Sequence, residues 1–222
     1  MTQQADGELN DLQRDALTEV VNIGVSRAAV SLRKMVGEQV IMSVPSLELI
    51  SRNAAAKLIR ERESDQLVAV SQDFDGPFAG RALLIFPAAS SLSLVRAVAG
   101  SAVAEEDVES MEDEALAETG NVVLNGCLAS MANMLKQRFI LSLPKVVRGD
   151  GRLLFEAPIS GTGGTGMVLF LYINFTLSDR ALRGYIAMMM DLPSITVLRD
   201  MVDEFIERIV GSEGEAGALD QD

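Results

Sequence analysis

An internal repeat constrains the fold of this chain more than any other feature of its sequence. The segment DALTEVVNIGVSRAAVSLRKMVGEQVIMSVPSL, which begins at Asp15, aligns without a gap with EALAETGNVVLNGCLASMANMLKQRFILSLPKV, which begins at Glu114. Each copy predicts a long helix and then a short strand that ends at a proline. A chain of 222 residues suits a single domain. We therefore expect residues 1–222 to form one domain of two halves, 9–105 and 106–190, related by a pseudo-two-fold axis.

The remainder of each half predicts strands that pair as hairpins. In the first half, DQLVAVSQDF and GRALLIFP are β-like and SSLSLVRAVAG is helical; in the second, RLLFEAPIS and GMVLFLYINF are β-like and SDRALRGYIAMMM is helical. Gly80 and Gly166 begin the second strand of each hairpin. This order is typical of an α+β fold with a largely antiparallel sheet. GTGGTG at 161–166 lacks the lysine of a phosphate-binding loop and favours a hairpin turn.

The C-terminal region predicts one further helix and a tail. Residues 191–210 carry an apolar stripe at helical spacing, and Ser194 suits the N-cap. The stripe would either pack on the body of the protein or dock a partner. Residues 211–222 are acidic and glycine-rich, which predicts disorder. The stripe consists of Ile195, Leu198, Val202, Phe205, Ile206 and Ile209.

Composition excludes several classes of function. The chain has no His and a single Cys, Cys127, so zinc sites of the Cys/His kind and Ser-His-Asp or Cys-His catalysis cannot be built within one chain. Cys127 lies at an apolar helical position, which predicts a buried thiol. A net charge of -13 without a basic patch favours proteins or small cations as partners over nucleic acids or anionic membranes. Without a membrane-spanning run or a signal peptide, a cytoplasmic protein is expected.

A narrow polar stripe runs along the first repeated helix. With Asp15 at 0° on a helical wheel, Glu19 lies at about 40°, Asn22 at about 340° and Ser26 at about 20°. The second helix carries the same stripe: Glu114, Glu118, Asn121 and Asn125. Asn disfavours helices by some tenths of a kcal/mol, and acids four residues apart repel by roughly 0.2–0.5 kcal/mol.

Both unfavourable features of the stripe occur in both copies, although shared ancestry alone can preserve them. A solvated surface therefore stays open as an alternative. The other interpretation is functional: an acid can pair with a lysine of a partner, and an amide one turn away can hold a water in line with an electrophile.

The full motif spans the helix and the proline after it. It occurs as D-x3-E-x2-N-x22-P at Asp15, Glu19, Asn22 and Pro45, and as E-x3-E-x2-N-x22-P at Glu114, Glu118, Asn121 and Pro144. Two copies in one chain resemble the CheC branch of the CheC/CheX/FliY phosphatase family of bacterial chemotaxis. The resemblance covers about residues 9–190.

This resemblance implies a pseudo-two-fold CheC-like fold with two exposed motif-bearing helices, to which the C-terminal helix would be an addition. It implies hydrolysis of the aspartyl phosphate of a CheY-type response regulator. Glu19 and Glu118 would dock the regulator's lysine, and Asn22 and Asn121 would orient the attacking water. No cofactor is expected on this chain, because the regulator holds the Mg²⁺. A CheD-type deamidase is a second implied partner.

The chain departs from the family pattern at Glu114, where Asp or Ser is usual, and it shows no FliN-like C-terminal domain. Two alternatives to a phosphatase remain. One is a non-catalytic adaptor that binds a response regulator or a CheD-type deamidase. The other is a structural protein that oligomerises through its C-terminal helix.

Overall fold

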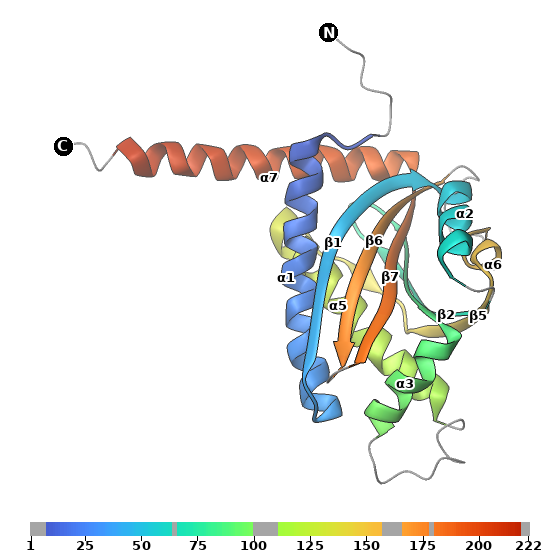
Figure 1. Ribbon diagram of the computed structural model, residues 1–222. Helices are drawn as coiled ribbons and strands as arrows, with labels where there is room; N and C mark the ends of the chain where they lie inside the picture. The colour runs from blue at the N-terminus through green and yellow to red at the C-terminus, as the bar shows by residue number, and fades with distance from the viewer. Residues whose placement is uncertain (1–7, 64–65, 100–110, 157–165, 178–179, 219–222) are drawn as a thin grey trace.

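The computed structural model describes residues 8–63, 66–99, 111–156, 166–177 and 180–218 (Figure 1). Within them, the two halves have the same order of elements. The first half consists of α1 (Asp11–Val36), β1 (Val40–Ser51), α2 (Arg52–Arg62), β2 (Leu67–Asp75), β3 (Gly80–Pro87) and α3 (Ala88–Ala99). The second consists of α5 (Glu112–Leu135), β4 (Ile140–Leu141), β5 (Lys145–Gly149), α6 (Gly151–Glu156), β6 (Gly166–Leu177), β7 (Arg180–Asp191) and α7 (Leu192–Ala218).

All described strands join one antiparallel sheet in the order β1-β6-β7-β3-β2-β4, and β5 also pairs with β2. This order is unchanged when the halves are exchanged, so the pseudo-two-fold axis passes between β3 and β7. Leu84 opposes Ile186 there. The first strands are interleaved, because β1 pairs with β6 while β4 and β5 pair with β2. The predicted duplicated α+β fold with a largely antiparallel sheet is confirmed.

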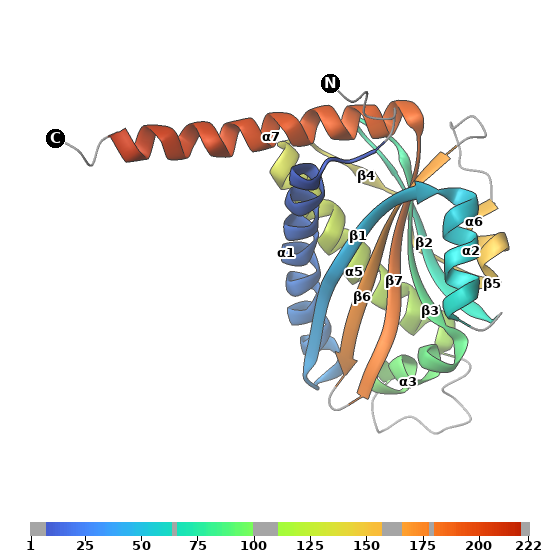
Figure 2. The ribbon, with the colours of Figure 1, turned by 45° about the horizontal axis from the view of Figure 1, so that its top comes forward.

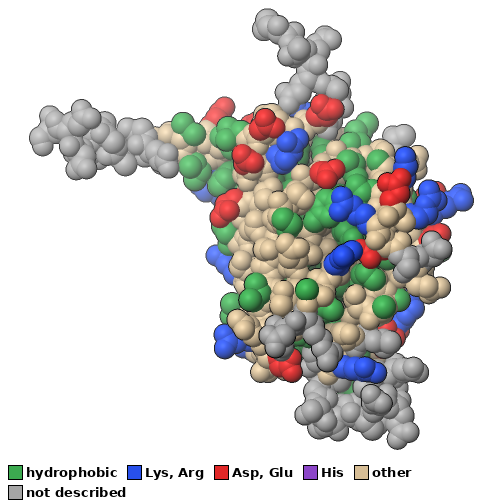
Figure 3. Space-filling view, viewed as in Figure 1, with side chains coloured by type: hydrophobic (Ala, Val, Ile, Leu, Met, Phe, Trp, Pro, Cys, Tyr) green, Lys and Arg blue, Asp and Glu red, His purple; other side chains and the backbone are tan. Residues whose placement is uncertain are grey.

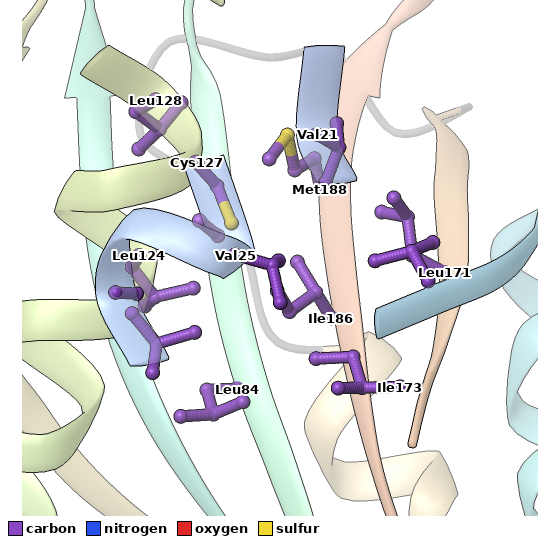
Figure 4. Packing of buried hydrophobic residues seen from close by; sticks show 14 of the residues in the cluster. Val21, Val25, Leu84, Leu124, Cys127, Leu128, Leu171, Ile173, Ile186 and Met188 are labelled. Atoms are coloured by element: carbon purple, nitrogen blue, oxygen red, sulfur yellow. The ribbon is translucent and has the colours of Figure 1, made fainter. Parts of the chain in front are cut away.

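The two repeated helices, α1 and α5, lie together over one face of the sheet and enclose the larger core (Figure 1). Figure 4 shows Val21 and Val25 of α1 beside Met188 and Ile186 of β7, and Leu124 of α5 on the side of Leu84 of β3. The helices cross closely at Gly24 and Gly126, where a Cβ on Gly24 would stand 2.7 Å from the Gly126 carbonyl oxygen. The other face of the sheet is covered by α2 and α6 over a smaller apolar cluster.

Local signals at its two ends define α1. At the start, Asn10 and Gln13 form a capping box: the Asn10 side chain accepts from the Gln13 N–H, and Gln13 accepts in return from the Asn10 N–H. At the end, Gly37 adopts φ 73°, the left-handed conformation that glycine takes most easily, and its N–H donates to the Arg33 carbonyl.

Two elements of the second half differ from their predictions. Residues 180–191 form the strand β7 rather than a helix, because Tyr185–Met190 lie in a central strand that is buried on both faces and so has no alternating pattern. Residues 151–156 form the helix α6 rather than a strand, as the counterpart of α2; residues 157–160 of that prediction lie outside the described residues. The hairpin turn expected at 161–165 also lies outside them.

These corrections change which elements correspond between the halves. The strand β6 is the counterpart of β2, and β7 is the counterpart of β3, so the equivalence expected between Gly80 and Gly166 is wrong. The strand β1 continues through Pro45 to Ser51 instead of ending there, with a register shift between Ser43 and Ser46. An edge strand tolerates proline because one side of its backbone has no strand partner.

The C-terminal helix α7 is the counterpart of α3, since each follows the last strand of its half. It continues to Ala218, so the expectation of disorder is wrong for 211–218, and 219–222 lie outside the described residues. Asp191 rather than Ser194 caps it, accepting from the Ser194 N–H at 2.8 Å. Figures 1 and 2 show its first turns against the body and its C-terminal part projecting away.

Candidate functional site

The first motif lies on α1 beside the edge strand β1. Asp15, Glu19 and Ser26 are exposed, and Asn22 is partly buried. The Asn22 amide forms two hydrogen bonds with the backbone of Val44 in β1. Its Nδ2 donates to the Val44 carbonyl at 3.1 Å, and its Oδ1 accepts from the Val44 N–H at 2.7 Å. Val44 directly precedes Pro45 and lies where the pairing of β1 with β6 shifts. In the first motif, the spacing from Asn to Pro therefore places Asn22 against the residue before Pro45.

The second motif lies on α5 beside β4 and β5, at the other edge of the sheet. Glu114 and Glu118 are exposed, and Asn121 is partly buried. The Asn121 Oδ1 accepts from Asn125 Nδ2 at 2.9 Å and from Gln72 Nε2 at 3.3 Å. Within the described part of the chain, the Asn121 Nδ2 donates to no residue.

The link from Asn121 to the strand segment before Pro144 is indirect. Gln72 of β2 makes it, because its Nε2 also donates to the Ser142 carbonyl at 3.0 Å. The helix can approach β2 here because Gly120 lies directly on Val70, where a Cβ would stand 2.4 Å from the Val70 side chain. Val70 and Gln72 share a face of β2, so this close approach brings Asn121 within reach of Gln72.

The two sites also differ in the residue before the proline. Val44 is 2% exposed, whereas the equivalent Leu143 is 82% exposed, and Ile140 beside it is 77% exposed. The strand breaks between β4 and β5 at this point, so the Leu143 side chain lies outside the core. The second site therefore presents apolar surface from the segment before its proline, whereas at the first site the exposed apolar side chain beside the Glu and Asn is Ile23 of α1 itself.

The surface charge is unevenly distributed. Figure 3 shows acidic side chains over the end of α1 that lies near α7, and Lys and Arg side chains on the side that carries α2. The helix α2 contains Arg52, Lys57, Arg60 and Arg62, which the sequence analysis did not recognise as a basic surface. The acidic end adjoins the start of the first motif and suits a partner with a positive charge.

Neither the single cysteine nor a cluster of metal ligands offers a reactive centre among the described residues. Cys127 is fully buried, as predicted, and burial raises the pKa of its thiol to about 12. No group of three or more His, Cys, Asp or Glu in the described ranges is placed to hold a metal ion. None of the described helices is long and apolar enough to cross a bilayer. With exposed carboxylates and amides held by hydrogen bonds, the arrangement can bind and orient a partner.

Sequence reasoning brought forward all the motif residues but missed Gln72. The signal was present, since Gln72 shares a face of the strand LVAVSQDF with the apolar Val68, Val70 and Phe74, and it is 1% exposed. A buried amide needs partners, and such a position therefore deserved a search for one.

A duplicated α+β fold with two Glu/Asn pairs, one on each of two adjacent helices, defines the class of this protein. No protein-family model matches the chain. It is 24% identical over 143 residues to the CheY-P phosphatase CheC of Bacillus subtilis (strain 168), covering 62% of this chain and 67% of that one. It is 22% identical over 141 residues to the flagellar motor switch phosphatase FliY of the same strain, covering 63% of this chain but only 36% of FliY.

Solved structures show the same fold. FliY of Thermotoga maritima superposes with a TM-score of 0.67 at 16% identity, covering 89% of this chain and 98% of that one. The FliM middle domain from H. pylori superposes with a TM-score of 0.59 at 6% identity, covering 87% and 99%. The chain therefore has the fold of these structures and is similar in sequence to CheC and FliY, two proteins of the family that the repeated motifs resemble.

Proposed function

We propose that this protein accelerates hydrolysis of the aspartyl phosphate of a CheY-type response regulator. The observation that carries the proposal is the geometry shared by both halves: an exposed Glu and, one turn later, an Asn whose amide is held by hydrogen bonds to its own scaffold. The relative named CheY-P phosphatase CheC supports the same chemistry. A cytoplasmic location follows from such a substrate.

The regulator supplies the electrophile and the Mg²⁺, and this chain binds no cofactor. Glu19 or Glu118 pairs with a lysine of the regulator, which their exposure allows. An amide N–H of Asn22 or Asn121 holds a water in line with the phosphorus. The water oxygen forms a bond to phosphorus, the bond to the aspartyl oxygen breaks, and inorganic phosphate and the free carboxylate result.

The magnitudes assign different work to the two residues. The regulator covers the pair of Glu and Lys when it docks, and truncating one member of a buried, hydrogen-bonded charge pair costs about 2–5 kcal/mol, so each Glu holds the regulator at its site. Holding the water in an attacking geometry can lower a barrier by up to about 7–11 kcal/mol, of which a small part suffices for a labile acyl phosphate. Most of the acceleration is therefore assigned to the Asn.

Phosphate release from a phosphorylated CheY-type regulator, followed by stopped flow, tests the proposal. The wild type should raise the rate above that of the regulator alone, and Glu19→Gln with Glu118→Gln should remove most of the increase. Glu204→Gln with Glu207→Gln, two exposed acids of α7, removes the same charge and should leave the rate unchanged. A wild type that gives no acceleration refutes the proposed function.

A non-catalytic adaptor is the second candidate, and the fold shared with FliM middle domains favours it. Its partner would be a response regulator or a CheD-type deamidase. Calorimetry that shows binding of the phosphorylated regulator, together with an unchanged rate of phosphate release, would establish the adaptor and exclude the phosphatase.

A further inference from the structure

We propose that Gln72, contributed by the first half of the chain, is a positioning residue for Asn121 and makes the second site the one that carries most of the turnover. The inference rests on the proposed function. It adds a residue outside both motifs and assigns unequal roles to two sites with nearly the same motif.

Gln72 fixes the orientation of the Asn121 amide. Its Nε2 donates to the Asn121 Oδ1 at 3.3 Å and to the Ser142 carbonyl at 3.0 Å, so the glutamine bridges α5 and the segment before Pro144. Asn125 donates to the same Oδ1 at 2.9 Å. A carbonyl oxygen has two lone pairs, and both are then used. The amide oxygen is held toward β2 and Asn125, which leaves both Nδ2 hydrogens for a water.

The first site has no equivalent of Gln72. Ile173 of β6 opposes the segment before Pro45, as Gln72 of β2 opposes the segment before Pro144. Figure 4 shows Ile173 among apolar side chains of the core, and it has no donor to offer. The Asn22 amide instead turns to the backbone of Val44 with both its oxygen and its nitrogen.

Asn22 therefore has a structural task that Asn121 does not have. It hydrogen-bonds the backbone of Val44, a residue without a register partner on β6 where the register shifts. One N–H of Asn22 is left for a water, and moving the amide toward a partner would leave the buried Val44 N–H and C=O unpaired. The Asn121 amide makes no such backbone contact.

Burying the Gln72 side chain costs folding free energy, which argues against a role in stabilising the fold. Its Oε1 is buried without a hydrogen-bond partner among the described residues. An apolar side chain of the same size would avoid this penalty. Departures from good packing of this kind are expected at functional sites. Exposed Leu143 and Ile140 add an apolar contact for a partner at the same site.

The test is Gln72→Met, which keeps the shape and removes the donor, with Ile173→Met as the matched control in the other half. Phosphate release is measured with each variant alone and with one site disabled by Glu19→Gln or Glu118→Gln. We expect Gln72→Met to lower kcat about fivefold, as the loss of one hydrogen bond would, with KM and melting temperature unchanged. Ile173→Met should leave kcat unchanged.

Comparing Gln72→Met in the two single-site backgrounds distinguishes loss of Asn121 positioning from a general disturbance of the fold. With Glu19→Gln, only the second site works, and the full loss should persist; with Glu118→Gln, Gln72→Met should lower kcat no further. Equal effects in the two backgrounds, or a wild-type kcat in folded Gln72→Met, overturn the inference while the proposed function stands. If Met overpacks the site, the shorter Gln72→Leu gives the same comparison. A wild type without activity removes the proposed function itself, and this inference with it.

Discussion

Replacing Asn22 with Ala removes two hydrogen bonds to Val44 and leaves a buried backbone N–H and C=O of β1 without partners. Each unpaired buried group costs about 1–3 kcal/mol. The change to Ala returns up to about 0.7 kcal/mol of helix propensity in α1. We expect the free energy of unfolding to fall by about 1–6 kcal/mol. The same change at Asn121 leaves Gln72 bonded to Ser142, so a fall of about 1 kcal/mol or less is expected.

Urea unfolding followed by far-UV circular dichroism measures the difference, since the chain has no Trp for fluorescence. The midpoint should shift while the slope against urea stays constant, because a change of slope would indicate an altered native or denatured state. Ser26→Ala is the control: this exposed residue shares the polar stripe of α1, and its replacement should raise the midpoint slightly through helix propensity.

Equal destabilisation by Asn22→Ala and Asn121→Ala would refute the reasoning, because it would mean that the two amides do the same structural work. The expected inequality also matters for enzymology. A loss of activity in Asn22→Ala would have two causes that cannot be separated: the amide no longer holds a water, and β1 is no longer hydrogen-bonded to α1. The exposed Glu19 and Glu118 are therefore the cleaner probes of each site.

Three further outcomes are expected. Gly24→Ala should destabilise the fold by about 1–3 kcal/mol, because its Cβ would meet the Gly126 carbonyl, whereas Gly211→Ala, in open space on a helix, should stabilise it slightly; calorimetric melting compares them. Leu143→Ser should raise the KM for the regulator and leave the melting temperature unchanged, since that side chain is exposed. The Cys127 thiol, whose pKa burial raises to about 12, should stay unreactive to a thiol reagent at pH 8 until urea unfolds the chain.

The parts of the fold that were predictable have strong local patterns. The repeat fixed the helix and strand that carry each motif, and GRALLIFP predicted β3 with its observed bounds. The failures have physical reasons. A central strand such as β7, apolar on both faces, cannot be distinguished from a buried helix by periodicity. The helix α6 has only six residues and is too short to show a helical period.

Only those contacts of the candidate site that join residues close together in the sequence could be predicted. Glu19 and Asn22 are one turn apart on a single helix, so their proximity follows from helical geometry alone. The contact of Asn121 with Gln72 joins residues 49 positions apart and depends on how α5 lies on β2. Val44 is buried and Leu143 is exposed because β1 has a register shift and the strand of the second half breaks between β4 and β5. The equal spacing in the two motifs does not indicate this difference.

Interleaving of the halves explains how two similar motifs can acquire unequal roles. The strand β2 of the first half pairs with β4 and β5 of the second, and β6 of the second pairs with β1 of the first. The helix α5 therefore lies on a strand from the other half, at Gln72, whereas α1 lies against β1 of its own half. A substitution in one half changes the environment of the motif in the opposite half. The second half alone would retain Glu118 and Asn121 but lose the strand and the glutamine that orient them.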